Sequence, residues 1–347
     1  MSKKIFSAVV ALALFLVGCG GNNTPTAGTT TSATTSTTTA ASQSAASSTT
    51  AGESAASGTT ATTTKTSTTT ATSTTTTQTS TTTAKEATTT TTADPSSSPF
   101  NYPQKGKNYT AEATWQAFFK SPQQTHKKLQ GSCYANGYWY VSFIKDDNPE
   151  SGVYIVKYDE RFEPVATSEP LALDHSNNLS YNPHTNQILV SHCQSGGRDR
   201  WAWYSFVDPD TLTVISTGEL PNPFFSMAYS PEKKLYGSAR WAGQTVDVWD
   251  KDLNHLRSFD VETPQTLSQG VFCDASYIWF VRSSTAQAPY SEMRLYDWDT
   301  GECAFVIPID NLLGGEPESL HLVDDMLYIL SDAGGFVDVF TVQLIEE

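Results

Sequence analysis

The chain lacks the motifs that usually hold a metal ion or carry redox chemistry. It has six histidines and five cysteines among its 347 residues, and no Cys-x-x-Cys pair. This excludes a zinc knuckle and a thioredoxin-type redox motif. A His-Glu-x-x-His sequence and a regular Asp/Asn calcium loop are absent as well. The sequence therefore predicts no cofactor, with calcium left as an alternative at the carboxylates of Glu316 and Glu318.

Positive charge is scarce. The chain has 36 Asp and Glu residues against 21 Lys and Arg, and residues 1–98 hold only three of the acids and four of the bases. Residues 99–347 therefore carry 33 acids and 17 bases, a net charge of −16. Such a surface repels phosphate backbones, so nucleic acid is not expected as a partner. It is compatible with calcium, cationic peptides or neutral sugars, although solubility alone also explains it.

A long hydrophobic run is missing too. Lys3 and Lys4 precede an apolar stretch, residues 5–17, which is far shorter than the roughly 20 residues of a membrane-spanning helix. This is the composition of an export signal. At its end, Leu16-Val17-Gly18-Cys19 resembles the bacterial lipobox, in which the signal is cut before a cysteine that is then diacylated.

The resemblance implies a signal peptide at residues 1–18 and lipidation of Cys19. Two acyl chains suffice for stable membrane anchoring. We therefore expect an extracytoplasmic protein that is anchored to a bacterial membrane at the cell surface. An ordinary secretory signal with a chance cysteine is the alternative, and the sequence does not distinguish an inner, outer or single membrane.

Residues 19–98 consist mostly of Thr, Ser and Ala, with almost no apolar bulk. Such a segment cannot bury enough surface to offset the entropy of ordering, so it predicts a disordered stalk. Hydroxyl-rich tracts of this kind are also O-glycosylation targets. The simplest interpretation is a spacer between the membrane and residues 99–347.

Residues 99–347 contain a repeated pattern of strand, tight turn and strand. A second hairpin follows in each of the first four units, so the unit is four short antiparallel strands in roughly 45 residues, as in a β-propeller blade. An Asp after the third strand is expected to cap the next turn, at Asp159, Asp208, Asp250 and Asp299. The first hairpins pair Gln130–Tyr134 with Tyr138–Phe143, Asn178–Tyr181 with Gln187–Ser191, Ser226–Tyr229 with Lys234–Ser238, Gln269–Phe272 with Tyr277–Val281, and Glu318–His321 with Met326–Ser331.

The pattern predicts an all-β fold, a propeller of five four-stranded blades, and a monomer. Six blades with a degenerate first blade is the alternative. The fifth unit ends after Val337–Leu344 without a fourth strand, and an unpaired edge would invite aggregation. The missing strand is expected between Phe100 and Lys128. Within that stretch, Ala111–Lys120 is interpreted as a short helix packed on the ring.

The first strand of each propeller blade lines the central channel, so the residues at the entry of these strands should meet at one mouth. A mostly neutral, hydrogen-bonding ring suits a sugar or another polar uncharged ligand, or else bonds only to backbone and water. His175 is the best candidate for a functional imidazole, and the neighbouring carboxylates of Glu316 and Glu318 could share a proton or hold calcium. The candidate ligand-binding residues are Gln130, Asn178, Ser226, Gln269 and Glu318, with His175, Asn177 and Glu316 just upstream.

Leu267–Phe272 followed by Trp279–Ser284 resembles the opening blade of plant-type glutamine cyclotransferases, which are five-bladed. That family places a catalytic Glu just after the aromatic pair of the second strand. Val281 or Arg282 stands there in this chain. The resemblance supports the fold, and the departure argues against that activity.

These features favour a cell-surface module that binds a glycan, peptide or protein partner through the channel mouth. The alternative is an extracellular hydrolase, lyase or glutamine-cyclotransferase-like enzyme that uses Glu316, Glu318 and His175. Four further cysteines allow two disulfides in three pairings, or buried free thiols. They are Cys133, Cys193, Cys273 and Cys303.

Overall fold

The computed structural model describes residues 100–347 except 146–150, 194–200, 241–243, 262–265, 284–289 and 311. The expected signal peptide, Cys19 and stalk lie outside these residues and stay predictions. The described part contains 20 strands and no helix. None of it forms a helix with the length and apolar character needed to span a bilayer.

The strands form five antiparallel four-stranded sheets. Blade 1 holds β2 (Lys128–Ala135), β3 (Tyr138–Ile144), β4 (Val153–Tyr158) and β5 (Pro164–Thr167). Blade 2 holds β6 (Asn178–Asn182), β7 (Gln187–Ser191), β8 (Trp203–Val207) and β9 (Val214–Glu219). Blade 3 holds β10 (Ser226–Ser230), β11 (Leu235–Ala239), β12 (Thr245–Asp250) and β13 (His255–Asp260). Blade 4 holds β14 (Leu267–Cys273), β15 (Tyr277–Ser283), β16 (Glu292–Asp297) and β17 (Cys303–Pro308). Blade 5 holds β18 (Glu316–Val323), β19 (Met326–Asp332), β20 (Val337–Glu346) and β1 (Tyr109–Phe119).

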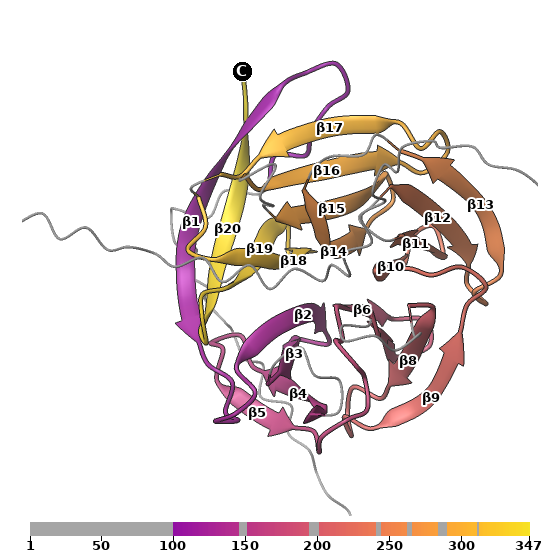
Figure 1. The fold of residues 1–347 in the computed structure, drawn as a ribbon. Coiled ribbons are helices and arrows are strands. Elements are labelled where there is room, and N and C mark those ends of the chain that lie inside the picture. The colour runs from indigo at the N-terminus through magenta and orange to yellow at the C-terminus, as the bar shows by residue number, and fades with distance from the viewer. Residues whose placement is uncertain are drawn as a thin grey trace, which may run out of the picture. The chain divides into compact units, whose positions relative to one another are not determined.

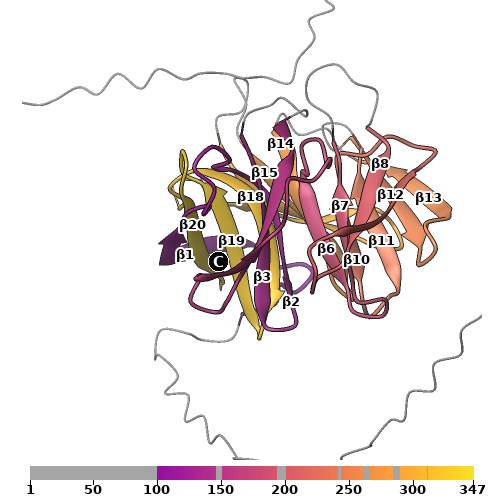
Figure 2. The same cartoon turned by 90° about the horizontal axis from the view of Figure 1, so that it is seen from below.

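The sheets stand around a common axis, as Figure 1 shows. Each innermost strand contacts the innermost strands of the next blades, and these strands are β2, β6, β10, β14 and β18. Figure 2 shows the blades from the side, with their strands running roughly along the axis. The five-bladed propeller is thus confirmed, and so is the place of the first strand of each blade at the centre, here called the hub.

Ring closure uses the segment that the sequence indicated. β1 pairs antiparallel with β20 and supplies the fourth strand of blade 5. The predicted helix over Ala111–Lys120 is wrong, because this stretch is the middle and end of β1. Pairing with the open edge of β20 satisfies its backbone groups, and that tertiary contact overrides a local pattern that also suits a helix.

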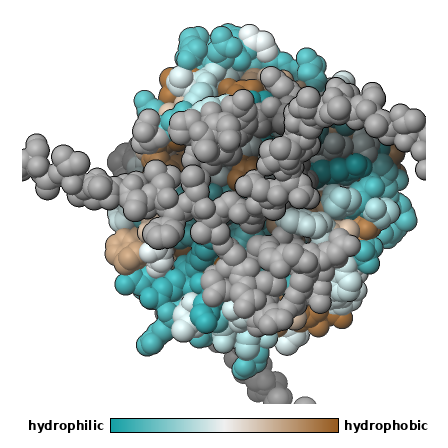
Figure 3. All heavy atoms as spheres, in the orientation of Figure 1, coloured by the Kyte–Doolittle hydropathy of each residue, from teal (hydrophilic) through white to brown (hydrophobic). Residues whose placement is uncertain are grey.

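The hydrophobic core lies between adjacent sheets. Large rings that fill it include Trp249, Trp279 and Trp298, all fully buried. Hydrophilic residues predominate on the visible rim of the face in Figure 3, in keeping with the excess of acids.

The turn caps follow the prediction in three blades. In each, the Asp carboxylate accepts the backbone N–H two residues on, at Asp159, Asp208 and Asp250. In blade 4 the cap is Asp297, which accepts the N–H of Asp299 at 2.9 Å. The prediction of Asp299 is wrong because β16 ends at Asp297, which places the cap two residues earlier than expected.

The four cysteines of the described part form no disulfide with one another. Cys133 and Cys273 lie near the C-terminal ends of β2 and β14 and are almost fully buried. Burial raises the pKa of both thiols well above the ordinary value. The alternative of buried, apolar thiols therefore describes these two residues, rather than a disulfide framework.

Candidate functional site at the hub

The polar residues expected at the entry end of the hub, where the first strands begin, are largely buried. Asn177 Nδ2 donates to the carbonyl of Gln269 at 3.3 Å, which links blades 2 and 4. Gln269 Nε2 donates to Glu316 Oε1 at 2.6 Å, which links blades 4 and 5. The structure thus brings these three residues together. The buried members of the set are Gln130, His175, Asn177, Asn178, Ser226, Gln269 and Glu318, whereas Glu316 is exposed.

Three of the entry residues lie at β-bulges. The ladder register shifts around Gln130 in β2, around Gln269 in β14 and around Glu318 in β18. A bulge inserts an extra residue and changes the direction of a side chain. The same irregularity in three blades shows that the entry end departs from a regular strand where the candidate residues lie.

These entry side chains mostly bond to the propeller itself. Gln130 Nε2 donates to the carbonyl of its own neighbour Leu129 at 2.6 Å. Gln269 Nε2 also donates to Ser283 Oγ at 2.8 Å. Hydrogen bonds within the propeller therefore occupy the amide groups of Gln130 and Gln269. A role for these two residues in ligand binding stays a prediction.

Asn178 crosses the hub and closes it. Its Nδ2 donates to the carbonyls of Met227 at 2.9 Å and Val271 at 3.2 Å, and its Oδ1 accepts the N–H of Val271 at 3.3 Å. The backbone around it packs closely, since a Cβ on Gly131 would lie 2.9 Å from Asn178 Cα. One amide thus ties blade 2 to blades 3 and 4.

Replacing Asn178 with Ala should lower the free energy of unfolding by roughly 2 kcal/mol, because a buried N–H and two carbonyls would lose their partner. Urea unfolding of the variant against the unaltered chain measures this. Asn182→Ala is a control at the other end of β6, where the side chain donates to Tyr236 Oη and accepts the N–H of His184 but, among the described residues, bonds to neither blade 4 nor a hub carbonyl. Equal, small losses in both variants would contradict a cross-hub role for Asn178.

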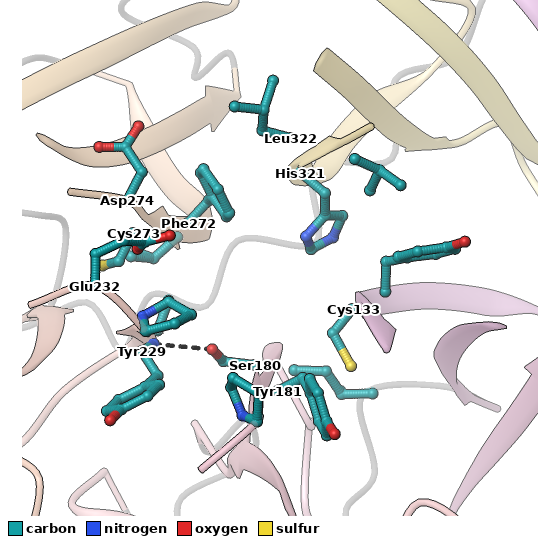
Figure 4. A pocket seen from close by; sticks show the side chains of 17 residues that line it. Cys133, Ser180, Tyr181, Tyr229, Glu232, Phe272, Cys273, Asp274, His321 and Leu322 are labelled. Carbon is teal, nitrogen blue, oxygen red and sulfur yellow. Dashed lines mark hydrogen bonds between the residues drawn. The ribbon is translucent and has the colours of Figure 1, made fainter. Parts of the chain in front are cut away.

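The opposite end of the hub, where the first strands run into their turns, contains a cavity of about 260 Å³. Five rings near the turn ends of the five inner strands line it, namely Tyr134, Tyr181, Tyr229, Phe272 and His321. We call it the turn-end cavity (Figure 4). The candidate residues predicted from the sequence do not include this site, although each first strand carries a ring near its end.

His321 is the main polar group in the turn-end cavity, and its ring extends into the open space in Figure 4. Its Nε2 lies 2.8 Å from Ser132 Oγ, which in turn lies 2.6 Å from Ser319 Oγ. Its Nδ1 makes no hydrogen bond to any described residue. Desolvation lowers the pKa of His321 to about 3, so the ring is neutral near pH 7.

Ser180 and two acidic residues complete the polar lining. Ser180 Oγ accepts the N–H of Tyr229 at 2.9 Å, which leaves its O–H as a donor. Glu232 and Asp274 line the rim, and the described lining residues include no Lys or Arg. The turn-end cavity is therefore aromatic inside and acidic at its edge.

A Ser–His–Asp arrangement is present in blade 2 but is buried. His192 Nδ1 lies 2.7 Å from Asp174 Oδ2, and its Nε2 lies 2.8 Å from Ser205 Oγ. The Ser205 side chain is fully buried, so a substrate has no access to its oxygen. At the equivalent ladder position of blade 3, the buried Asp247 binds Arg240 instead. In both clusters, polar side chains of one blade bond to one another in the interior of that blade.

Among the described residues, no group of three or more His, Cys, Asp or Glu side chains is arranged to bind a metal ion. Calcium at Glu316 and Glu318 stays an untested alternative.

Comparisons with known proteins define the class as a five-bladed β-propeller and go no further. No family model and no curated protein matches the sequence. Among solved structures, the chain is similar to glutaminyl cyclase of Myxococcus xanthus, with a TM-score of 0.50, 11% identity, and coverage of 70% of this chain and 100% of that chain. It is also similar to the tail fiber of Staphylococcus aureus phage P68, with a TM-score of 0.50, 12% identity, and coverage of 67% of this chain and 53% of that chain. At such identities the likeness shows the fold alone.

Proposed function

We propose that this chain is a lipid-anchored binding module of the bacterial cell surface, which takes its ligand in the turn-end cavity. The observation that carries the proposal is that all five inner strands contribute an aromatic or imidazole ring, near their turn ends, to the lining of one open space. Such a cavity, mostly apolar with a few polar groups, is the usual form of a small-ligand site.

The size of the cavity limits what enters it. A volume of about 260 Å³ lies just below the usual range for sites that take drug-sized ligands. It accommodates one sugar unit or one side chain, rather than a whole polymer. The ligand is then the end group of a glycan, a peptide or a protein, with the rest of the partner outside.

The N-terminal sequence supports this role. Lipidation of Cys19 would attach the chain to a membrane, and residues 19–98 would hold the propeller away from it. A stalked, anchored module presents a ligand site to the surroundings of the cell. The ring of blades is closed within one chain, so the proposal requires only a monomer.

A binding role is favoured over the glutamine-cyclotransferase-like alternative. The position after the aromatic pair Trp279-Phe280, where that family has its catalytic Glu, is Val281 followed by Arg282. Arg282 is fully buried, and its Nε donates to Thr266 Oγ1 at 2.8 Å. Arg282 therefore bonds to other residues in the interior of blade 4. Unlike a Glu at this position, it has no carboxylate for acid–base chemistry.

The test is a ligand-observed NMR screen of sugars, amines and short peptides against the mature protein and its Phe272→Ala variant. Compounds that bind are expected to lose at least tenfold in affinity in the variant, because a wall of the cavity is gone. Trp115→Ala is the matched control, since Trp115 is 53% exposed on the outer strand β1. Compounds that bind both variants equally well would place the ligand elsewhere and contradict the proposal.

A further inference from the structure

The electrostatic character of the turn-end cavity is more specific than its shape. Aromatic rings present negative π-faces, and carboxylates near such rings add a negative potential. The rim carries Glu232 and Asp274, and no Lys or Arg is among the described lining residues. The propeller itself has a net charge of −16. Every one of these features favours a positively charged ligand.

Glu232 is the carboxylate that is available to a ligand. It is exposed, its only hydrogen bond in the described structure is a long one of 3.4 Å from Ser230 Oγ, and it forms no ion pair with a described residue. Its neighbour Lys233 turns instead to Asp299, at 3.8 Å. Figure 4 shows the Glu232 side chain extending toward the side of the cavity where Phe272 lies.

Asp274 is held in place by the protein. Its carboxylate accepts Tyr102 Oη at 2.6 Å, Trp279 Nε1 at 2.6 Å and the N–H of Ser276 at 2.7 Å. These donors are neutral, so they fix the carboxylate without cancelling its charge. Burial, and to a lesser extent the charges of Asp324 and Glu160, raise the pKa of Tyr134, so further carboxylates lie near this ring of the cavity.

The inner wall offers few groups to bond with the many hydroxyls of a sugar. Apart from the thiols of Cys133 and Cys273, its remaining side chains are apolar, namely Leu179, Pro183, Ala228, Pro231, Val271, Leu322 and Val323. Ser180 and His321 supply the interior polar atoms. Because His321 is neutral at ordinary pH, it does not repel a cation. An alkylated ammonium group needs no dense hydrogen bonding and gains from ring faces.

From these observations we infer that the turn-end cavity binds an organic cation, an alkylammonium group held among the five rings with Glu232 as its counter-ion. The inference rests on the proposed function and narrows its ligand class. A quaternary ammonium head group and the side chain of a lysine in a peptide share this chemistry.

The test titrates the mature protein with choline, with Nα-acetyl-lysine methylamide, and with 3,3-dimethylbutan-1-ol, the neutral isostere of choline. At least one cation is expected to bind at least tenfold more tightly than the isostere, with affinity that falls as salt rises. The tighter of the two cations identifies the source of the ammonium group.

Variants separate the charge from the cavity. Glu232→Gln should weaken cation binding three- to tenfold and leave the isostere unchanged, while Phe272→Leu should weaken all probes. Glu219→Gln, an exposed acid on β9, is the matched control and should change nothing. Thermal unfolding of each variant verifies that it is folded.

Two results would overturn the inference, and they differ in whether the proposed function also fails. If the isostere binds as tightly as choline and Phe272→Leu weakens both, the cavity is a ligand site and only the cation is wrong. If neither cation binds, the inference is wrong. If in addition no screened compound responds to changes at Phe272, the proposed function fails with it.

Discussion

A chain that begins at Pro122 is expected to lose its monomeric fold. It would lack β1, which pairs with β20 over the whole length of that strand. Residues at the two ends of β1 also reach the neighbouring blades. Tyr109 packs on Phe305 of blade 4, with ring centroids 5.9 Å apart. Phe119 packs on Tyr158 of blade 1, with ring centroids 4.6 Å apart.

Burial of two aromatic rings contributes roughly 3–6 kcal/mol, which is a large part of the net stability of an ordinary domain. The exposed edge of β20 would in addition recruit other chains. Light scattering coupled to size exclusion should therefore show oligomers or aggregates, and thermal unfolding should lose its cooperative transition.

The control is a chain that begins at Pro99. It lacks the predicted signal, anchor and stalk but keeps β1, so it should be monomeric with the same unfolding temperature as the mature protein. A monomeric, cooperatively unfolding protein that starts at Pro122 would show that ring closure does not depend on β1.

Acid is expected to destabilise the propeller through His321. The pKa of this buried ring is about 3 in the folded chain and about 6.5 in an unfolded chain. Between these values the unfolded state binds more protons than the folded state, so the free energy of unfolding falls as the pH falls. From pH 7 to pH 4 this residue alone should cost about 3 kcal/mol.

Urea unfolding at pH 7 and pH 4 measures this loss in the unaltered chain and in His321→Gln, where an amide replaces the titrating ring next to Ser132. The variant should lose about 3 kcal/mol less between the two pH values. The control is His184→Gln, because His184 is exposed in a turn and its replacement should leave the acid sensitivity unchanged. An equal acid sensitivity in His321→Gln would contradict the assignment.

The entry end of the hub shows which features of the site could be predicted from the sequence. The repeat correctly placed Gln269 and Glu316 near one another, since both lie at the entry ends of inner strands in adjacent blades. Whether their side chains stay free for a ligand depends on distances across the hub, such as the 2.6 Å between Gln269 Nε2 and Glu316 Oε1. Residues this far apart in sequence leave no local trace of such a bond.

The turn-end cavity was missed for a similar reason. A ring near the end of each first strand is typical of ordinary blade packing, and Tyr229 does pack against Tyr236, with ring centroids 4.7 Å apart. The open space between the five rings arises only when the five strands converge. Its acidic rim is built from turns, where Glu232 and Asp274 look like surface residues in the sequence.

The sequence by itself indicated the repeated hairpins and favoured five blades over six, because those follow from local alternation and from a repeat that each unit carries within it. The tertiary structure alone decided that residues 111–119 form a strand rather than a helix, that Asn178 bridges three blades, and that an aromatic cavity lies at the turn end of the hub. Each of these depends on a partner far away in the chain, whose hydrogen bonds and surfaces outweigh local preference only after the ring has closed.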